Sequence, residues 1–218
     1  AQRMGEFVCW AALSLLKGAR RIAANQAQSK WDYFEPEHTA PDRPVGIMGL
    51  GHMGARAAAM LRGLGFPVLG WSRTRKAFEG VESFCGTEEM DAFLARTGIL
   101  VCLLPATAET RGILAKPLLD KLPDGAGLIN VGRGSHQRIE DVLAALDSGK
   151  LSGALLDVFE AEPLPADHPA WPHPKLIVTP HLASLPTRRE RAAHVARGIA
   201  MHERGEALPN LYDHARGY

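Results

Sequence analysis

Short apolar runs recur along the middle of the chain, and each run ends at a glycine, a proline or a polar side chain. A strand that is apolar on both sides is typical of a parallel sheet whose two faces are covered by helices. Helical segments alternate with these runs, which is the order of a doubly wound α/β fold. We therefore expect parallel strands near residues 44–48, 66–71, 83–85, 99–104, 127–131, 153–158 and 175–178.

Helical spacing is clearest near the two ends of the chain. Apolar residues recur with a helical period from Met4 to about Arg21, so we expect a helix there. A charged helix is expected from about Thr187 to Arg204, before a polar tail, and a shorter helix over residues 139–146. Residues 29–44 are polar and interrupted by prolines, which predicts a linker or a surface loop.

A glycine-rich turn directly follows the first apolar run. Gly49, Gly51 and Gly54 have the G-x-G-x-x-G spacing, and the alanine-rich residues 55–64 after them predict a helix. In this arrangement the first glycine allows the turn, the second lets a pyrophosphate approach the backbone, and the third lets the helix pack closely. The helix N-terminus would hold the phosphates, because its first N–H groups have no partner inside the helix. The turn therefore predicts a Rossmann dinucleotide site, with a purely structural turn as the alternative.

The end of the second strand indicates which nucleotide binds. NAD-binding units usually place Asp or Glu there to hold the ribose hydroxyls. In this chain the position is Ser72, followed by Arg73 and Arg75, and residues 64–78 contain no acidic residue. A hydroxyl and two guanidiniums suit a 2′-phosphate, which an acidic residue would repel. We expect NADP(H) to be preferred, with NAD(H) possible; a solvated basic loop is the alternative.

Candidate catalytic side chains follow the later strands, whose carboxyl ends share one edge of the sheet. Arg133 stands between two glycines, and its guanidinium suits a carboxylate or a polarised carbonyl. Asp157 could accept a hydrogen bond from a nicotinamide amide or could have a structural role. His181 could donate a proton to a carbonyl oxygen, with Glu162 as its carboxylate partner. A surface arginine and a satisfied loop histidine are the alternatives.

Composition narrows the classes of function. The 218 residues carry 25 Lys and Arg against 24 Asp and Glu, so a net charge of +1 gives no electrostatic case for nucleic acid or an anionic membrane. Three widely spaced cysteines predict free buried thiols in a reducing compartment. His168 and His173 have no clear third ligand, so we expect no metal site. The apolar residues 7–16 are too short to span a bilayer and lack the features of a signal peptide, so we expect a cytoplasmic protein.

Three stretches, in this order, resemble the signature of the D-2-hydroxyacid dehydrogenases. They are residues 130–134 (NVGRG), 156–164 (LDVFEAEPL) and 178–181 (VTPH). The resemblance covers nearly the whole chain and is closest to the glyoxylate/hydroxypyruvate reductase A type. Further stretches similar to that type are residues 71–76, 121–125, 143–150 and 215–218. The resemblance implies hydride transfer from NADPH to the keto carbon of glyoxylate or hydroxypyruvate.

The resemblance also implies a role for each candidate residue. Arg133 would bind the carboxylate and carbonyl of the substrate, and His181 would act as acid and base with Glu162 as its partner. Glu160 lies two residues earlier, where the pattern of the family varies. The nucleotide would contact Gly49, Gly51, His52, Met53, Gly54, Ser72, Arg73, Thr74, Arg75, Leu104, Pro105, Thr110, Val131, Arg133, Asp157, His181, Ala183 and Ser184.

A division into domains follows from the same resemblance. We expect an interdomain and dimerisation helix in residues 1–30, a linker in 31–43, the dinucleotide-binding domain in 44–184, and a crossing helix with a tail toward the substrate domain in 185–218. Family members carry a further N-terminal part that forms most of a substrate domain, so we expect this chain to be a fragment. Such a fragment would bind NADPH and form a homodimer but reduce its 2-keto acid poorly or not at all, because cleft closure would be lost. Its tail from about Leu208 would be prone to disorder.

Other functions share parts of this pattern. A β-hydroxyacid dehydrogenase favours the same glycine turn, but it uses a lysine late in the chain and would leave Arg133, Glu162 and His181 unexplained. A nucleotide-sensing corepressor module would bind nucleotide tightly without turnover. Oxidation of formate or phosphite on the same scaffold would favour different groups near the histidine.

Overall fold

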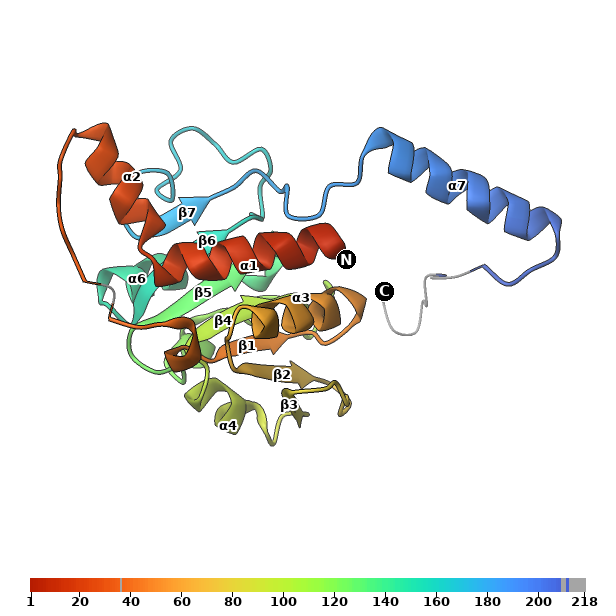
Figure 1. Cartoon of the computed structure of the whole chain (residues 1–218), viewed down its shortest axis with the longest axis horizontal. Coiled ribbons are helices and arrows are strands. Elements are labelled where there is room, and N and C mark those ends of the chain that lie inside the picture. The colour runs from red at the N-terminus through yellow and green to blue at the C-terminus, as the bar shows by residue number, and fades with distance from the viewer. Residues whose placement is uncertain (36, 209–210, 212–218) are drawn as a thin grey trace.

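The computed structural model describes residues 1–35, 37–208 and 211 of the chain. Its centre is a seven-stranded sheet in the order β3-β2-β1-β4-β5-β6-β7, and every neighbouring pair is parallel (Figure 1). The strands are β1 Val45–Met48, β2 Val68–Ser72, β3 Val81–Cys85, β4 Ile99–Cys102, β5 Ala126–Asn130, β6 Leu151–Leu156 and β7 Leu176–Val178. The predicted doubly wound parallel sheet is confirmed. Its order reverses between β1 and β4, the point beyond which such sheets bind ligands.

Helices cover both faces of the sheet (Figure 1). They are α1 Gln2–Leu16, α2 Ala19–Ala27, α3 His52–Gly63, α4 Met90–Ala95, α5 Lys116–Leu119, α6 Ile139–Asp147 and α7 Arg188–Glu203, with 3-10 turns η1 Ala40–Asp42 and η2 Gly134–His136. Successive residues of a strand point to opposite faces. In β4, Ile99 and Val101 accordingly join the core under α1 and α3, whereas Leu100 and Cys102 join the core under α4, α5 and α6. Burial on both sides explains the uninterrupted apolar runs in the sequence.

The expected helix from Met4 to about Arg21 is in fact two helices, so that expectation was wrong in extent. α1 ends at Leu16, and Gly18 adopts a left-handed conformation (φ +67°) before α2 begins. Glycine takes this conformation without a steric penalty, so it terminates helices readily. α1 packs against α3 and lies over β5 and β6, whereas α2 has no buried side chain.

Two short helices were not expected from the sequence. α4 has six residues and α5 has four, which is too short for a hydrophobic period to be visible. The expected linker over residues 29–44 is irregular apart from the single turn η1. Arg21 in α2 holds this segment through an ion pair with Asp32 (2.8 Å) and through its position over the Phe34 ring.

α7 extends away from the sheet (Figure 1), and none of its side chains is buried. Its first turn is capped by Thr187, whose hydroxyl accepts from the Glu190 N–H (3.1 Å), while Arg3 in α1 forms an ion pair with Glu190 (3.0 Å). The expectation of a disordered tail concerns residues 209–210 and 212–218, which lie outside the described residues. Within the described part of the chain, no helix combines the length and apolar character that crossing a membrane requires.

Candidate active site

The glycine turn between β1 and α3 has a separate steric reason at each glycine. Gly49 has φ +105°, and a Cβ atom there would lie 2.7 Å from the Leu103 carbonyl oxygen at the end of β4. A Cβ atom at Gly54 would collide with the Gly49 carbonyl oxygen, so only glycine lets α3 start this close to the strand. A Cβ atom at Gly51 would meet nothing within 4 Å. The open space beside Gly51 is the place where a pyrophosphate can approach the backbone.

The N-terminus of α3 faces this open space. The helix begins at His52 after Gly51, and no side chain caps it. His52 and Met53 are exposed, and the first turn contains no acidic residue. The uncapped N–H groups and the helix dipole therefore favour an anion at this position. The residues present thus fit the phosphates of a dinucleotide.

The Ser72–Arg75 segment continues from β2 and carries an acidic neighbour that the sequence did not indicate. The Ser72 hydroxyl donates to the Thr74 carbonyl (2.7 Å). Arg75 donates to the Ser83 carbonyl (2.5 Å) and pairs with Glu89, the residue before α4. The Cys85 N–H hydrogen bond and, to a lesser extent, Arg75 lower the pKa of Glu89, so this carboxylate stays ionised. Part of the positive charge expected for a 2′-phosphate is therefore shared with Glu89.

Arg133 lies in a tight turn after β5. Its side chain is exposed, and its Nη1 donates to the Gly132 carbonyl (2.7 Å). A Cβ atom at Gly132 would lie 2.8 Å from the His136 ring, and one at Gly134 would collide with the Phe159 backbone. The two glycines therefore permit close approach and do not supply free space. Close packing on both sides holds the Arg133 backbone in place.

His181 and Glu162 form a direct pair. His181 Nδ1 lies 2.7 Å from Glu162 Oε2, and Glu162 Oε1 accepts from the Phe159 N–H (2.8 Å). Glu160 points elsewhere and pairs with Arg111 (3.2 Å). His181 has a left-handed backbone (φ 52°), which is held because its N–H donates to the Asp157 carbonyl (2.8 Å). A histidine in this region is uncommon and strained, and such residues gather at functional sites.

Burial raises the pKa of Glu162, but other effects outweigh burial and leave the pKa below its ordinary value. They are the hydrogen bonds from His181 and from the Phe159 N–H, followed by the charges of His181 and Arg133. The influence of Arg133 shows that its guanidinium lies within electrostatic reach of this pair. Glu162 therefore stays ionised at neutral pH and can hold a protonated His181.

The carboxylate of Asp157, at the end of β6, is buried and used within the protein. It accepts from the Thr179 hydroxyl (2.6 Å), the Leu182 N–H (3.0 Å) and the Ala183 N–H (2.9 Å). Of the two roles that the sequence left open, these contacts favour the structural one. Asp157 fixes the loop that carries His181.

The other candidate cofactor residues follow the strands. Leu104 and Val131 are buried directly after β4 and β5, Ala183 is buried in the loop after β7, and Ser184 is half-buried. The Thr110 hydroxyl donates to the Pro105 carbonyl (2.7 Å) and accepts from the Thr107 N–H (2.9 Å), so it shapes its own loop. The loop of Leu104 to Thr110 is thereby held in a compact turn beside the glycine turn.

Three polar residues are buried beneath the Arg133 turn: Asn130, His136 and Gln137. Asn130 belongs to the stretch 130–134, but the sequence did not single out His136 and Gln137. These two follow the arginine without a recognisable spacing, and only their polarity next to an apolar strand could have drawn attention to them.

The remaining expectations concern cysteines and metal. Cys9 and Cys102 are free and buried, whereas Cys85 is free but only partly buried, which corrects the expectation for that residue. Burial raises the pKa of the Cys102 thiol to about 12, so this thiol is unreactive. His168 Nδ1 accepts from the Ala170 N–H and His173 Nδ1 from the Lys175 N–H, so both rings shape their loop. Among the described residues, no group of three or more His, Cys, Asp or Glu side chains is arranged to hold a metal.

A Rossmann sheet with an arginine, a glutamate and a histidine at its carboxyl edge defines a class of nucleotide-dependent oxidoreductases. The family described as D-isomer specific 2-hydroxyacid dehydrogenase, NAD binding domain, matches residues 9–183. The chain therefore belongs to this family. The alternative of a β-hydroxyacid dehydrogenase, which the glycine turn alone left open, is thereby set aside.

Relatives and solved structures agree with this assignment. A glyoxylate/hydroxypyruvate reductase A of Salmonella paratyphi B is 48% identical over 212 residues, which are 96% of this chain and 68% of that protein. A 2-hydroxyacid dehydrogenase of Xanthobacter autotrophicus Py2, solved with NADPH and MES, has a TM-score of 0.92 at 43% identity and covers 100% of this chain and 89% of that chain. An NADPH-dependent glyoxylate/hydroxypyruvate reductase of Sinorhizobium meliloti, solved with NADP and sulfate, has a TM-score of 0.93 at 42% identity, covering 99% and 69%.

Proposed function

We propose that this chain supplies the nucleotide site and the catalytic side chains for NADPH-dependent reduction of a small 2-keto acid, such as glyoxylate or hydroxypyruvate. The observation that carries the proposal is the 2.7 Å pair of His181 and Glu162 at the sheet edge that also holds the Arg133 turn. The identity of the substrate is supported by the relatives, which are named glyoxylate/hydroxypyruvate reductases.

In the proposed reaction each side chain has a task. When bound, the dihydronicotinamide supplies a hydride to the keto carbon. Nδ1 of His181 faces Glu162, so Nε2 is the atom that can deliver a proton to the keto oxygen. Glu162 stabilises the protonated imidazole and fixes its orientation. Arg133 binds the carboxylate and polarises the carbonyl through its guanidinium. One hydride and one proton added to the carbonyl give the 2-hydroxy acid.

The nucleotide preference rests on the end of β2. Ser72, Arg73 and Arg75 offer donors and positive charge for a 2′-phosphate, and no acidic side chain lies between residues 64 and 78. Two related structures contain NADPH or NADP. Glu89 takes up part of the charge of Arg75. With Arg73 beside it, we still expect NADPH to bind preferentially and NADH to bind more weakly.

Calorimetric titration of this chain with NADPH and with NADH tests the proposal first. We expect the Kd for NADPH to be at least about tenfold lower, because charge-assisted bonds to a phosphate are stronger than neutral ones. Substituting Arg73→Ala should remove much of the difference, whereas Arg188→Ala on exposed α7 is a control that should leave both affinities unchanged. If neither NADPH nor NADH binds, the proposed function is contradicted. A parallel assay of glyoxylate reduction shows whether these residues suffice for turnover.

A further inference from the structure

His136 is fully buried at the end of η2, directly beneath the Arg133 turn. Its ring contacts two segments that are far apart in the sequence. Nδ1 lies 3.1 Å from the backbone nitrogen of Arg133, and Nε2 lies 3.1 Å from the carbonyl oxygen of Pro105. The mechanism above gives this histidine no task, although it joins the turn of the proposed substrate-binding arginine to the loop proposed to contact the nucleotide.

The two contacts determine the protonation of the ring. A backbone N–H can only donate, so Nδ1 must be the unprotonated acceptor. A carbonyl oxygen can only accept, so Nε2 must carry the proton. The ring is therefore neutral, with its proton on Nε2. A second proton on Nδ1 would break the bond from the Arg133 N–H and would place a charge in the core.

The surroundings of the ring favour this neutral state. Burial lowers the pKa of His136; the Pro105 carbonyl acts in the opposite direction, and the positive charge of Arg133 lowers the pKa further. Cys102 also faces the ring, with its sulfur 3.6 Å from Nδ1. Because burial keeps this thiol protonated, it adds no negative charge that would favour an imidazolium.

The same turn is tied to a third segment by neighbouring buried side chains. The Asn130 amide donates to the Arg133 carbonyl (3.1 Å) and to the Gln137 side chain (2.8 Å). Gln137 in turn donates to the Val158 carbonyl (3.0 Å), which precedes Glu162 along the chain. The N–H and the C=O of Arg133 therefore both bond to buried side chains. Of the side chains of Asn130, His136 and Gln137, only that of His136 bonds to the Pro105 loop.

We propose that His136 is a positioning residue that clamps the Arg133 turn to the Pro105 loop and so fixes the substrate-binding arginine relative to the bound nucleotide. Its part in catalysis rests on the proposed function, whereas the clamp itself is a property of the fold. A fixed distance matters because hydride transfer requires the keto carbon to be held in a narrow range of geometries against the nicotinamide.

Two conservative substitutions separate the two halves of the clamp. In His136→Asn the side-chain oxygen can replace Nδ1 as acceptor, but nothing reaches Pro105. In His136→Gln the longer amide can replace Nε2–H as donor to Pro105, but the Arg133 N–H loses its acceptor. His194→Gln on exposed α7 is the matched control. The affinity for NADPH is measured by calorimetry, and the protection of the Arg133 amide by hydrogen exchange.

We expect a crossed result. His136→Asn should weaken NADPH binding by about tenfold while the Arg133 amide stays protected, because the loss of one buried hydrogen bond is of that order. His136→Gln should leave the Kd for NADPH within about twofold while the Arg133 amide exchanges faster. Equal changes in both quantities for both variants, or no change in either, would overturn the clamp.

The unmodified chain gives an independent test that requires no variant to fold. Nitrogen NMR of histidine-labelled protein should show His136 as the neutral Nε2–H tautomer at neutral pH. An Nδ1–H tautomer, an imidazolium at neutral pH or an unprotected Arg133 amide would overturn the clamp. Failure of the chain to bind NADPH would instead contradict the proposed function. The NMR and exchange results would still decide whether His136 joins the Arg133 turn to the Pro105 loop.

Discussion

At the scale of single residues, the site depends on which of two nearby glutamates reaches His181. Glu162 lies against the ring, whereas Glu160 pairs with Arg111 on the surface. Glu160 is therefore a natural control for Glu162. The two side chains are two positions apart and have the same chemistry, so differences between their variants report position alone.

We expect Glu162→Gln to lower the rate of glyoxylate reduction by about 10²-fold, because the protonated form of His181 loses its counter-charge. This rate is measured as the oxidation of NADPH by glyoxylate, at a saturating concentration of NADPH and under conditions in which the unmodified protein turns over. Glu160→Gln should leave the rate unchanged. Equal losses in the two variants would show that His181 does not depend on this carboxylate.

The same residue makes stability depend on pH. The pKa of Glu162 is lower in the folded protein than its ordinary value of 4.5, so folding favours the ionised form. Its contribution is fully present above about pH 5 and is lost as the pH falls through the folded pKa. Urea unfolding of the unmodified chain and of Glu162→Gln should therefore give a stability difference that shrinks in acid. A difference that grows in acid would contradict the direction of the shift.

Gly134 offers a second test at the residue scale. Because a Cβ atom there would collide with the Phe159 backbone, Gly134→Ala must displace the Arg133 turn or the loop that follows β6. We expect the free energy of unfolding to fall by about 1–3 kcal/mol, the range typical of overpacking. Gly198→Ala in α7, where a Cβ atom meets nothing within 4 Å, is the control and should be neutral or stabilising. Urea denaturation measures both.

At the scale of elements, the stability of α7 is local. It has no buried side chain, so its N-terminal cap and the Arg3–Glu190 ion pair are its main supports. Helices of this length are marginal in water without packing. α7 is therefore expected to open without unfolding of the sheet.

We expect Thr187→Ala to destabilise α7 by about 1 kcal/mol, the usual effect of removing a cap. Faster amide exchange in residues 190–203, with unchanged exchange in β4 and β5, would show that the loss is local. Thr187→Ser keeps the hydroxyl and should preserve protection. The Thr187 backbone and side-chain hydrogen bonds and the ion pair with Arg3 lower the pKa of Glu190 to about 2, so the cap should persist to strongly acidic pH. Loss of exchange protection throughout the sheet would contradict this account.

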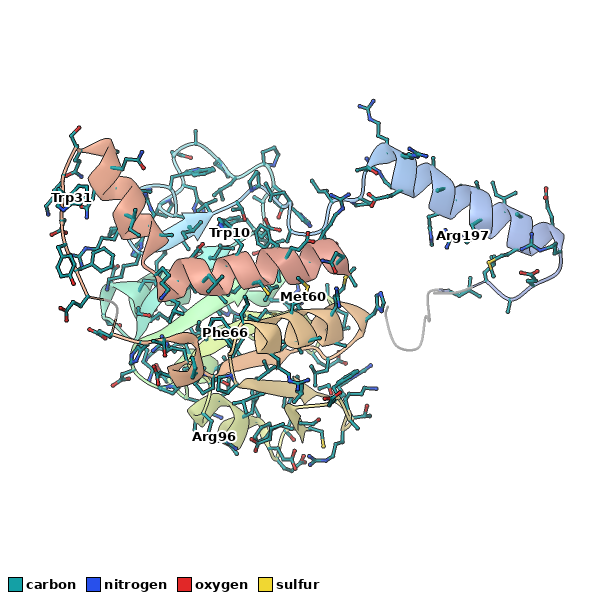
Figure 2. All side chains as sticks on the ribbon, in the orientation of Figure 1. Trp10, Trp31, Met60, Phe66, Arg96 and Arg197 are labelled. Atoms are coloured by element: carbon teal, nitrogen blue, oxygen red, sulfur yellow. The ribbon has the colours of Figure 1, made fainter. Side chains whose placement is uncertain are left out.

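At the scale of the whole molecule, one surface carries an unusual set of exposed aromatic residues. Trp31 and Tyr33 in the linker are 98% and 80% exposed, and Figure 2 shows Trp31 on this segment. Both line a hollow of about 750 Å³ between the linker and α2. Exposed aromatic side chains around a hollow are typical of protein interfaces.

We therefore predict a homodimer in which this surface meets the same surface of a second copy. Sedimentation at micromolar concentration should give the mass of a dimer. Trp31→Ser together with Tyr33→Ser should shift the protein toward monomer, whereas Val195→Ser on α7 should not. A monomer from the unmodified chain would contradict the prediction.

The doubly wound sheet, the glycine turn and the order of the candidate residues follow from the sequence by itself. Strands buried on both faces need continuous apolar runs, and Gly49 and Gly54 are required by local backbone geometry. The carboxyl ends of parallel strands meet at one edge, so Arg133, Glu162 and His181 were expected to lie close together. Such features follow from local patterns in the chain, together with the rule that the carboxyl ends of parallel strands share one edge of the sheet.

Only the tertiary structure decided features that depend on distant residues. It placed Glu89 against Arg75 and turned the carboxylate of Asp157 inward to hold the loop of His181. It also placed His136 between Arg133 and Pro105. For Asp157 and His136 the physical reason is the same: a buried polar group must find a partner, and which partner it finds depends on how the loops pack in space.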